Sequence, residues 1–199
     1  MSSPLLILAS ASPRRSELLR QIGVEFSVAA QHIDESQTPG EAVSAYVCRL
    51  AQEKAEAALQ PLADAEKGIV IAADTTVDCE DRILGKPQDR EDALAMLNLL
   101  SANTHRVLSA VTVASKTQRH SALCESVVRF RFISTAEAAA YWATGEPSDK
   151  AGAYAIQGLA AVFVQSLTGS YSGVMGLPLF ETAQLLEKFG VSMWQRSPE

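Results

Sequence analysis

Residues 68–76 read GIVIAADTT, the most strand-like stretch of the chain. The apolar run from Ile69 to Ala73 is continuous, which is typical of a strand buried on both faces. Leu5 to Ala9 is a second run of this kind. Helical patterns lie between and after these two runs, and strands and helices alternate irregularly. The pattern therefore predicts an α/β fold in which helices flank a mixed sheet.

Turn residues and apolar periodicity divide the remainder of the chain. Glu80-Asp81 predicts the turn of a hairpin, and the segments at 31–39 and 145–158 are expected as loops. Helices are expected at 13–23, 40–59, 89–100, 135–145 and 178–189, and further strands at 26–30, 106–115, 125–133 and 160–167. No internal repeat or low-complexity linker divides the chain, so we expect a single domain over residues 1–199, with a frayed tail from Ser192.

Composition excludes several classes of protein. The chain has 199 residues with 17 Lys and Arg against 23 Asp and Glu, so its net charge of −6 argues against coating nucleic acid. No apolar run approaches the ~20 residues of a membrane span, and the N-terminal segment lacks the basic start of a signal peptide. The three cysteines are widely spaced and expected as small, buried or half-buried apolar side chains. We expect a cytoplasmic protein that binds neither nucleic acid nor membrane.

The segment SASPRR at 10–15 lies where the first strand turns into the first helix. Ser12 and Pro13 predict an N-cap and a first helical residue. Ser10, Arg14 and Arg15 would supply hydroxyl and guanidinium groups to a phosphate at the helix N-terminus. The alternative is a capped helix with solvated arginines. Two cations at a helix N-terminus oppose the helix dipole, which favours a bound anion.

Asp74 follows the buried run directly, at the expected carboxyl end of the strand. Ligands of open α/β sheets gather at such strand ends. A carboxylate there can hold Mg²⁺ or take a proton from water. The alternative is an aspartate that ends the strand and binds turn amides.

Lys54 falls at the centre of an apolar helix stripe. At about 100° per residue, it lies on the same side as Val43, Val47 and Leu50. A lysine in this position either extends its ammonium outward to solvent or lines a cavity with it.

Glu35, Lys86 and Gln157 taken singly are typical of a solvated surface or of a loop. Taken together with the arginines, Lys54 and Asp74, they indicate a site for a polyanion and a divalent cation, suited to metal-assisted attack on a phosphoanhydride. The chain has no GxxxxGK[ST] segment, so it is not a P-loop enzyme. The histidines at 32, 105 and 120 share no metal-like spacing and are expected at the surface or as caps.

Five segments in order resemble the Maf family of nucleoside triphosphate pyrophosphatases, also described as septum-formation inhibitors. They are SASPRR (10–15), AADT (72–75), GKP (85–87), DKAGAYAIQG (149–158) and GLPL (176–179). The resemblance implies a fold similar to the inosine triphosphate pyrophosphatases, with two lobes around a cleft. It implies cleavage between the α- and β-phosphates with Mg²⁺ or Mn²⁺, and a homodimer. The positions matching the family's functional residues are Ser10, Arg14, Arg15, Glu35, Lys54, Asp74 and Lys86, with Asp74 as proton acceptor and Asp74 and Glu35 as metal ligands.

The branch of the family that acts on dTTP and UTP is indicated by Arg14, Thr75 and Gln157. A Gln carboxamide can pair with the edge of uracil or thymine, which presents an N–H donor between two carbonyl acceptors. The resemblance then implies a house-cleaning role against modified pyrimidine nucleotides. Two alternatives stay open: a pyrophosphatase for 7-methyl-GTP or modified purines, and a non-catalytic nucleotide-binding regulator of septum formation. Ala73 and Ala155 replace glycines that are common in the family.

Overall fold

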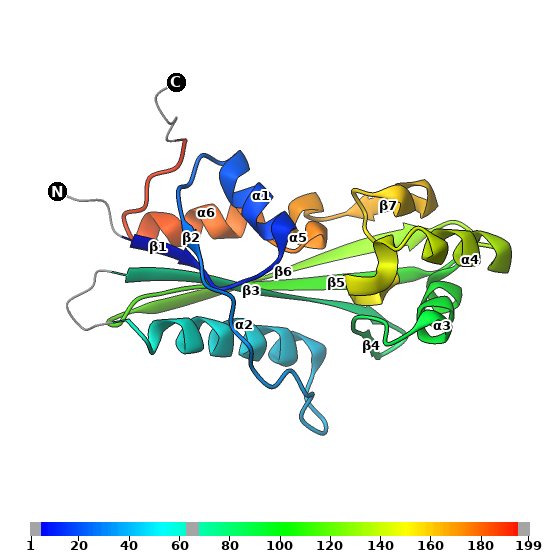
Figure 1. The fold of residues 1–199 in the computed structure, drawn as a ribbon, viewed down its shortest axis with the longest axis horizontal. Helices are drawn as coiled ribbons and strands as arrows, with labels where there is room; N and C mark the ends of the chain where they lie inside the picture. The colour runs from blue at the N-terminus through cyan, green and yellow to red at the C-terminus, as the bar shows by residue number, and fades with distance from the viewer. Residues whose placement is uncertain (1–4, 63–67, 195–199) are drawn as a thin grey trace. The chain divides into compact units, whose positions relative to one another are not determined.

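The computed structural model describes residues 5–62 and 68–194. Within them the strands form a mixed sheet in the order β2-β1-β3-β5-β6-β7, with β4 paired to β3 (Figure 1). This confirms the predicted α/β class. The strands are β1 (Leu5–Leu8), β2 (Ser27–Val28), β3 (Gly68–Cys79), β4 (Arg82–Leu84), β5 (Thr104–Ala114), β6 (Arg119–Phe130) and β7 (Val164–Thr168).

The described chain divides into two compact units. The first contains residues 5–62, 68–74, 109–124 and 176–194, and the second contains 75–108 and 125–175. The strands β3, β5 and β6 contribute residues to both. A single domain and a cleft between two lobes stay predictions.

The first unit is built on parallel pairing. β1 pairs in parallel with β2, and with β3 through the register of Leu5 with Gly68 and Leu8 with Ile71. The longest helix, α2, covers one face of these strands, and α1 and α6 cover the other (Figure 1). Its helices are α1 (Pro13–Gln21), α2 (Val43–Leu59) and α6 (Leu179–Lys188).

The second unit has its own core, in which α3 and α4 pack with the aromatic side chains of Phe130, Tyr141, Tyr154 and Phe163. Its hairpin β3-β4 turns at Glu80-Asp81, where both residues have positive φ, which confirms the predicted turn. Its helices are α3 (Arg90–Leu100), α4 (Thr135–Ala143) and α5 (Tyr171–Met175), with 3₁₀ turns at Glu146–Asp149, Ala151–Ala153 and Leu159–Phe163. In the described part of the chain no helix is long and apolar enough to cross a membrane.

Four expectations from the sequence are corrected. The strand predicted at 160–167 begins only at Val164, because Ala160 and Phe163 are buried three residues apart, as in a 3₁₀ helix. β6 begins at Arg119 rather than 125, and β2 has two residues rather than five. His105, expected at the surface, is buried at 1% exposure. The end of the predicted frayed tail, residues 195–199, lies outside the described residues.

Candidate active site

Strand alternation directs Asp74 toward α2. Val70 and Ala72 belong to one apolar cluster with Ala58 of α2. Successive side chains of a strand point to opposite faces, so Asp74, two positions beyond Ala72, faces the same helix. β3 continues past Asp74 to Cys79, which corrects the expectation that Asp74 ends the strand. The residues Thr75, Thr76 and Val77 favour extended backbone and carry the strand onward.

Lys54 joins the two predicted acids. Its Nζ lies 2.7 Å from Asp74 Oδ1 and 2.6 Å from Glu35 Oε1. Lys54 is 8% exposed and Asp74 7%, whereas the Glu35 side chain is about half exposed. Lys54 therefore does not extend outward to solvent. A buried ammonium is stable only when it is paired, and these carboxylates pair it.

The pKa of Asp74 is raised above its ordinary value. Burial is the main cause, and the charges of Lys54 and Arg15 oppose it, while Glu35 raises the pKa further. A carboxylate whose proton affinity is increased by burial is better suited to accept a proton near neutral pH than a solvated one. This is the environment expected of a general base.

The guanidinium of Arg15, in the first turn of α1, donates hydrogen bonds to Ser10 and Gly176. Its Nη1 donates to Ser10 Oγ at 3.1 Å, and its Nε donates to the carbonyl oxygen of Gly176 at 2.8 Å. Burial lowers the pKa of Arg15, and the nearby charges of Asp74 and Glu35 raise it in opposition. The attraction between Arg15 and these acids offsets the unfavourable helix dipole.

The first turn of α1 begins where the sequence predicts, while its role as a phosphate cradle stays a prediction. Pro13 is the first helical residue, as predicted, and Arg14 is half-buried. Ser12 occupies the N-cap position, but its side chain makes no capping bond. Its backbone N–H instead donates to Ser10 Oγ at 3.2 Å, so Ser10 orders the turn.

Two α2 residues that the sequence did not indicate hold the loop of Glu35. Tyr46 Oη donates to the carbonyl oxygen of Glu35 at 2.9 Å, and Arg49 Nη2 donates to the carbonyl oxygen of Ser36 at 3.0 Å. Arg49 also donates hydrogen bonds to both carboxylate oxygens of Glu41, at 2.7 and 2.8 Å. One helix therefore supplies Lys54 and positions the acid that Lys54 contacts.

Glu35 and Asp74 fit a divalent cation of the Mg²⁺ type. Their oxygens converge on one positive group, the Lys54 ammonium. Mg²⁺ is usually held by one or two carboxylates together with substrate phosphates and waters. Among the described residues, no cluster of three or more His, Cys, Asp or Glu side chains is arranged for a metal. A site of two carboxylates that the substrate completes is consistent with both observations.

The remaining predicted residues, Thr75, Lys86 and Gln157, belong to the second unit. Lys86 is exposed, and Thr75 and Gln157 are half-buried. The backbone N–H of Gly152 donates to the carbonyl oxygen of Gly85 at 3.0 Å, which joins the turn of Lys86 to the loop of Gln157. That these residues and Asp74 bind one substrate stays a prediction.

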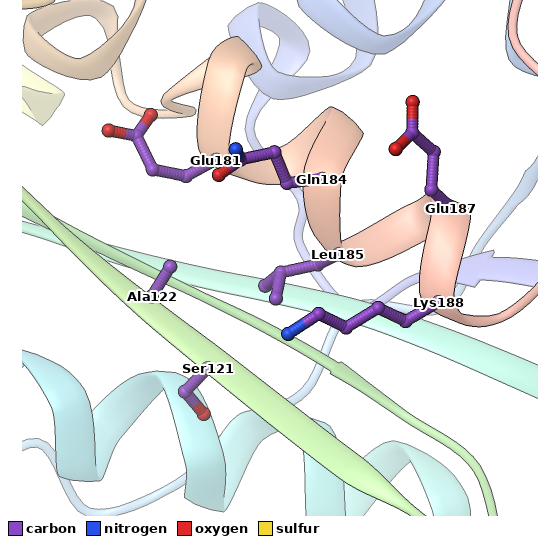
Figure 2. A pocket seen from close by; sticks show the side chains of 7 residues that line it. All are labelled: Ser121, Ala122, Glu181, Gln184, Leu185, Glu187 and Lys188. Carbon is purple, nitrogen blue, oxygen red and sulfur yellow. The ribbon is translucent and has the colours of Figure 1, made fainter.

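A hollow of about 580 Å³ lies on the first unit. Figure 2 shows Leu185 and Lys188 reaching from α6 toward the strand that carries Ser121 and Ala122. The described residues that line the hollow include no predicted site residue. They are Ser121, Ala122, Glu181, Gln184, Leu185, Glu187 and Lys188.

The pattern of the family described as Maf-like protein matches residues 5–189. The chain belongs to the Maf family. Among curated relatives of this Maf chain, dTTP/UTP pyrophosphatase of Hahella chejuensis is 50% identical over 95% of the chain and 94% of its own length. The protein of that name from Aromatoleum aromaticum is 52% identical, over 93% of the chain and 95% of its own length.

A third relative of this Maf chain, dTTP/UTP pyrophosphatase of Saccharophagus degradans, is 51% identical over 96% of the chain and 91% of its own length. Among solved structures, the Staphylococcus aureus Ham1 protein aligns at a TM-score of 0.41 and 14% identity, over 65% of the Maf chain and 72% of its own.

Proposed function

We propose that this protein hydrolyses dTTP and UTP between the α- and β-phosphates, releasing a nucleoside monophosphate and pyrophosphate. The observation that carries the proposal is the buried Asp74 carboxylate, which pairs with the ammonium of Lys54 and feels the charge of Arg15. Relatives about half identical to this chain bear the name of that activity.

The cations of the site would bind the triphosphate. Arg14 and Arg15 at the start of α1 present planar guanidinium groups that suit phosphate oxygens. Lys54 and Lys86 would add compact positive charge. Because charge builds on the leaving pyrophosphate, cations already in place lower the barrier to its release.

Asp74 and Glu35 would hold Mg²⁺ or Mn²⁺ against the phosphates. The ion would supply charge neutralisation and polarise the phosphoryl group. Lys54 contacts both acids and keeps them close together without the ion. The same Asp74 would orient a water molecule toward the α-phosphorus and accept its proton, a role favoured by its raised pKa.

Gln157 and Thr75 would select the base. The carboxamide of Gln157 both donates and accepts, so it can match the N3–H and a carbonyl of uracil or thymine. Thr75 follows Asp74 directly and would contact the nucleotide. A purine is larger and presents a different edge. We retain a house-cleaning role against modified pyrimidine nucleotides, a homodimer and a cytoplasmic location as predictions.

Product analysis across a panel of triphosphates tests the proposal. The protein is incubated with dTTP, UTP, CTP, ATP and 7-methyl-GTP, in Mg²⁺, in Mn²⁺ and in a chelator. We expect dTMP or UMP with pyrophosphate, and loss of turnover in the chelator. Nucleoside diphosphate with free phosphate, or a preference for 7-methyl-GTP, would overturn it. The Asp74→Asn variant, purified in parallel, controls for contaminating phosphatases.

A further inference from the structure

Gln157 sits in a tight turn whose two ends are both fixed. The backbone N–H of Gly158 donates to the carbonyl oxygen of Ala155 at 3.0 Å and closes the turn. Ala155 and Ile156 are buried at 3% and 6% exposure, while Gln157 is half-buried. The two residues before Gln157 are therefore anchored in the interior, while Gln157 itself is partly accessible.

Tyr141 of α4 holds the first end of this turn. Its Oη accepts the backbone N–H of Ala155 at 3.2 Å and donates to Glu146 Oε1 at 2.8 Å. The Tyr141 ring is buried and packs edge-on against Phe163, with 5.4 Å between ring centroids. A phenol fixed by packing gives the hydroxyl a fixed position.

Glu146 holds the other end. Its Oε2 accepts the N–H of Leu159 at 3.0 Å, and its Oε1 accepts the N–H of Ala160 at 3.4 Å. A Cβ built on Gly158 would lie 2.2 Å from Glu146 Oε2, so only glycine permits the carboxylate to approach this closely. The Glu146 carboxylate and the Tyr141 hydroxyl, which are hydrogen-bonded to each other, therefore bind the backbone on both sides of Gln157.

We propose that Tyr141 and Glu146 form a positioning pair that sets the discrimination between uracil and cytosine. The proposal rests on the proposed role of Gln157. Uracil presents an N3–H donor where cytosine presents an N3 acceptor, so a carboxamide distinguishes the two bases only when it meets the base edge at one defined position. Recognition of one pattern requires a side chain held to within about half an ångström. The pair fixes the backbone from which the Gln157 side chain extends, and so the point at which its carboxamide meets the base, without touching the base itself.

The test compares the ratio of kcat/KM for UTP to that for CTP in wild type, Tyr141→Phe, Glu146→Gln and Gly158→Ala. Each variant is expected to lower the ratio at least about tenfold, through a higher KM for UTP with kcat changed less than about threefold. The inhibition constant of pyrophosphate, which has no base, should stay within about twofold of wild type. Gly158→Ala displaces the Glu146 carboxylate by steric conflict while leaving the side chains of Tyr141 and Glu146 unchanged, so it tests the position of the carboxylate rather than its chemistry.

Glu137→Gln is the matched control. Glu137 lies on the same helix as Tyr141, accepts from Arg131 and caps the helix through Ser134, and in the described part of the chain none of its hydrogen bonds reaches residues 155–160. This variant should lower the melting temperature while leaving the UTP to CTP ratio unchanged. A loss of the ratio in Glu137→Gln equal to that in Glu146→Gln would mean that destabilisation alone moves it, and would overturn the proposal.

The Gln157→Ala variant separates the two levels of the account. One outcome is that Gln157→Ala lowers the UTP to CTP ratio while the Tyr141, Glu146 and Gly158 variants do not. The positioning pair is then rejected and the role of Gln157 stands. If Gln157→Ala itself keeps discrimination, the role of Gln157 and the positioning pair are rejected together. Loss in all four supports the proposal.

Discussion

The Lys54 ammonium lies 2.7 Å from the Asp74 carboxylate, and both side chains are almost fully buried. Neither charge would be stable there alone, because burial without a partner costs several kcal/mol. The same Lys54 also contacts Glu35. The site therefore holds two negative groups around one positive group, and a triphosphate with its cation would enter this arrangement.

Replacing Asp74 by Asn tests the proposed base. The change preserves shape but removes the negative charge that accepts a proton, so turnover of dTTP should fall at least about 100-fold. The fold should survive, because the Lys54 ammonium keeps Glu35 as a charged partner at 2.6 Å. Steady-state kinetics and circular dichroism measure the two effects. Turnover within a few-fold of wild type would remove Asp74 from the mechanism.

Replacing Lys54 by Met tests the electrostatic coupling. The Lys54 charge lowers the pKa of Asp74 in opposition to burial, so its removal should raise that pKa further. Asp74 acts as a base only when it is ionised. The acid limb of the pH profile of kcat/KM should therefore move to higher pH. Lys188→Met, on the exposed surface of α6, is the control and should leave the limb in place. An acid limb unchanged or moved to lower pH in Lys54→Met contradicts the coupling.

Arg49→Lys tests whether the loop of Glu35 must be held. A lysine cannot grip both oxygens of Glu41 and the carbonyl of Ser36, so the loop should loosen. Faster hydrogen exchange at Thr38, whose N–H binds Glu41, should accompany a roughly fivefold loss of kcat/KM, or about 1 kcal/mol. Arg119→Lys, which alters an exposed pair with Glu56, is the matched control and should change neither. If hydrogen exchange at Thr38 and kcat/KM are both unchanged in Arg49→Lys, Arg49 is not needed to hold the loop of Glu35.

His105 predicts a pH dependence of stability. Burial lowers the pKa of His105 to about 4, whereas an unfolded histidine titrates near 6.5. Between these values the unfolded chain takes up a proton that the folded protein does not, so the free energy of unfolding decreases as the pH falls. The decrease ends below pH 4 and amounts to about 3 kcal/mol.

The variant His105→Leu isolates this contribution. At pH 7 it should be less stable than wild type, because Tyr154 Oη loses its partner at 2.9 Å. The difference in the free energy of unfolding between wild type and this variant, measured by urea unfolding, should decrease by about 3 kcal/mol from pH 7 to pH 4. The exposed His32, replaced by Gln, should show no such narrowing. A difference between His105→Leu and wild type that is constant with pH contradicts the prediction.

The residues of regular elements were the ones that the sequence indicated well. Asp74 follows a long apolar run, and Lys54 interrupts a helical stripe, so periodicity alone brought both to attention. Their meeting depends on the parallel pairing of β1 with β3 and on the packing of α2, which no local pattern specifies. The resemblance to a family places both residues in one site, but the contact between their side chains comes from the structure.

Residues that act on backbone were the ones that the sequence did not indicate. Tyr46, Arg49, Tyr141 and Glu146 bind main-chain atoms of loops, and loops carry no period from which a partner can be read. The misassigned strand at 160–167 has the same origin. Its first residues look extended by composition, but Glu146 binds the N–H groups of Leu159 and Ala160, and the chain forms a 3₁₀ turn there.

Hydrolysis of dTTP in water enriched in oxygen-18 tests the central claim most directly, because it reports which phosphorus the water attacks. If Asp74 directs water to the α-phosphorus, mass spectrometry should find one heavy oxygen in dTMP and none in pyrophosphate. Heavy oxygen in pyrophosphate, or release of dTDP with labelled phosphate, would contradict the account.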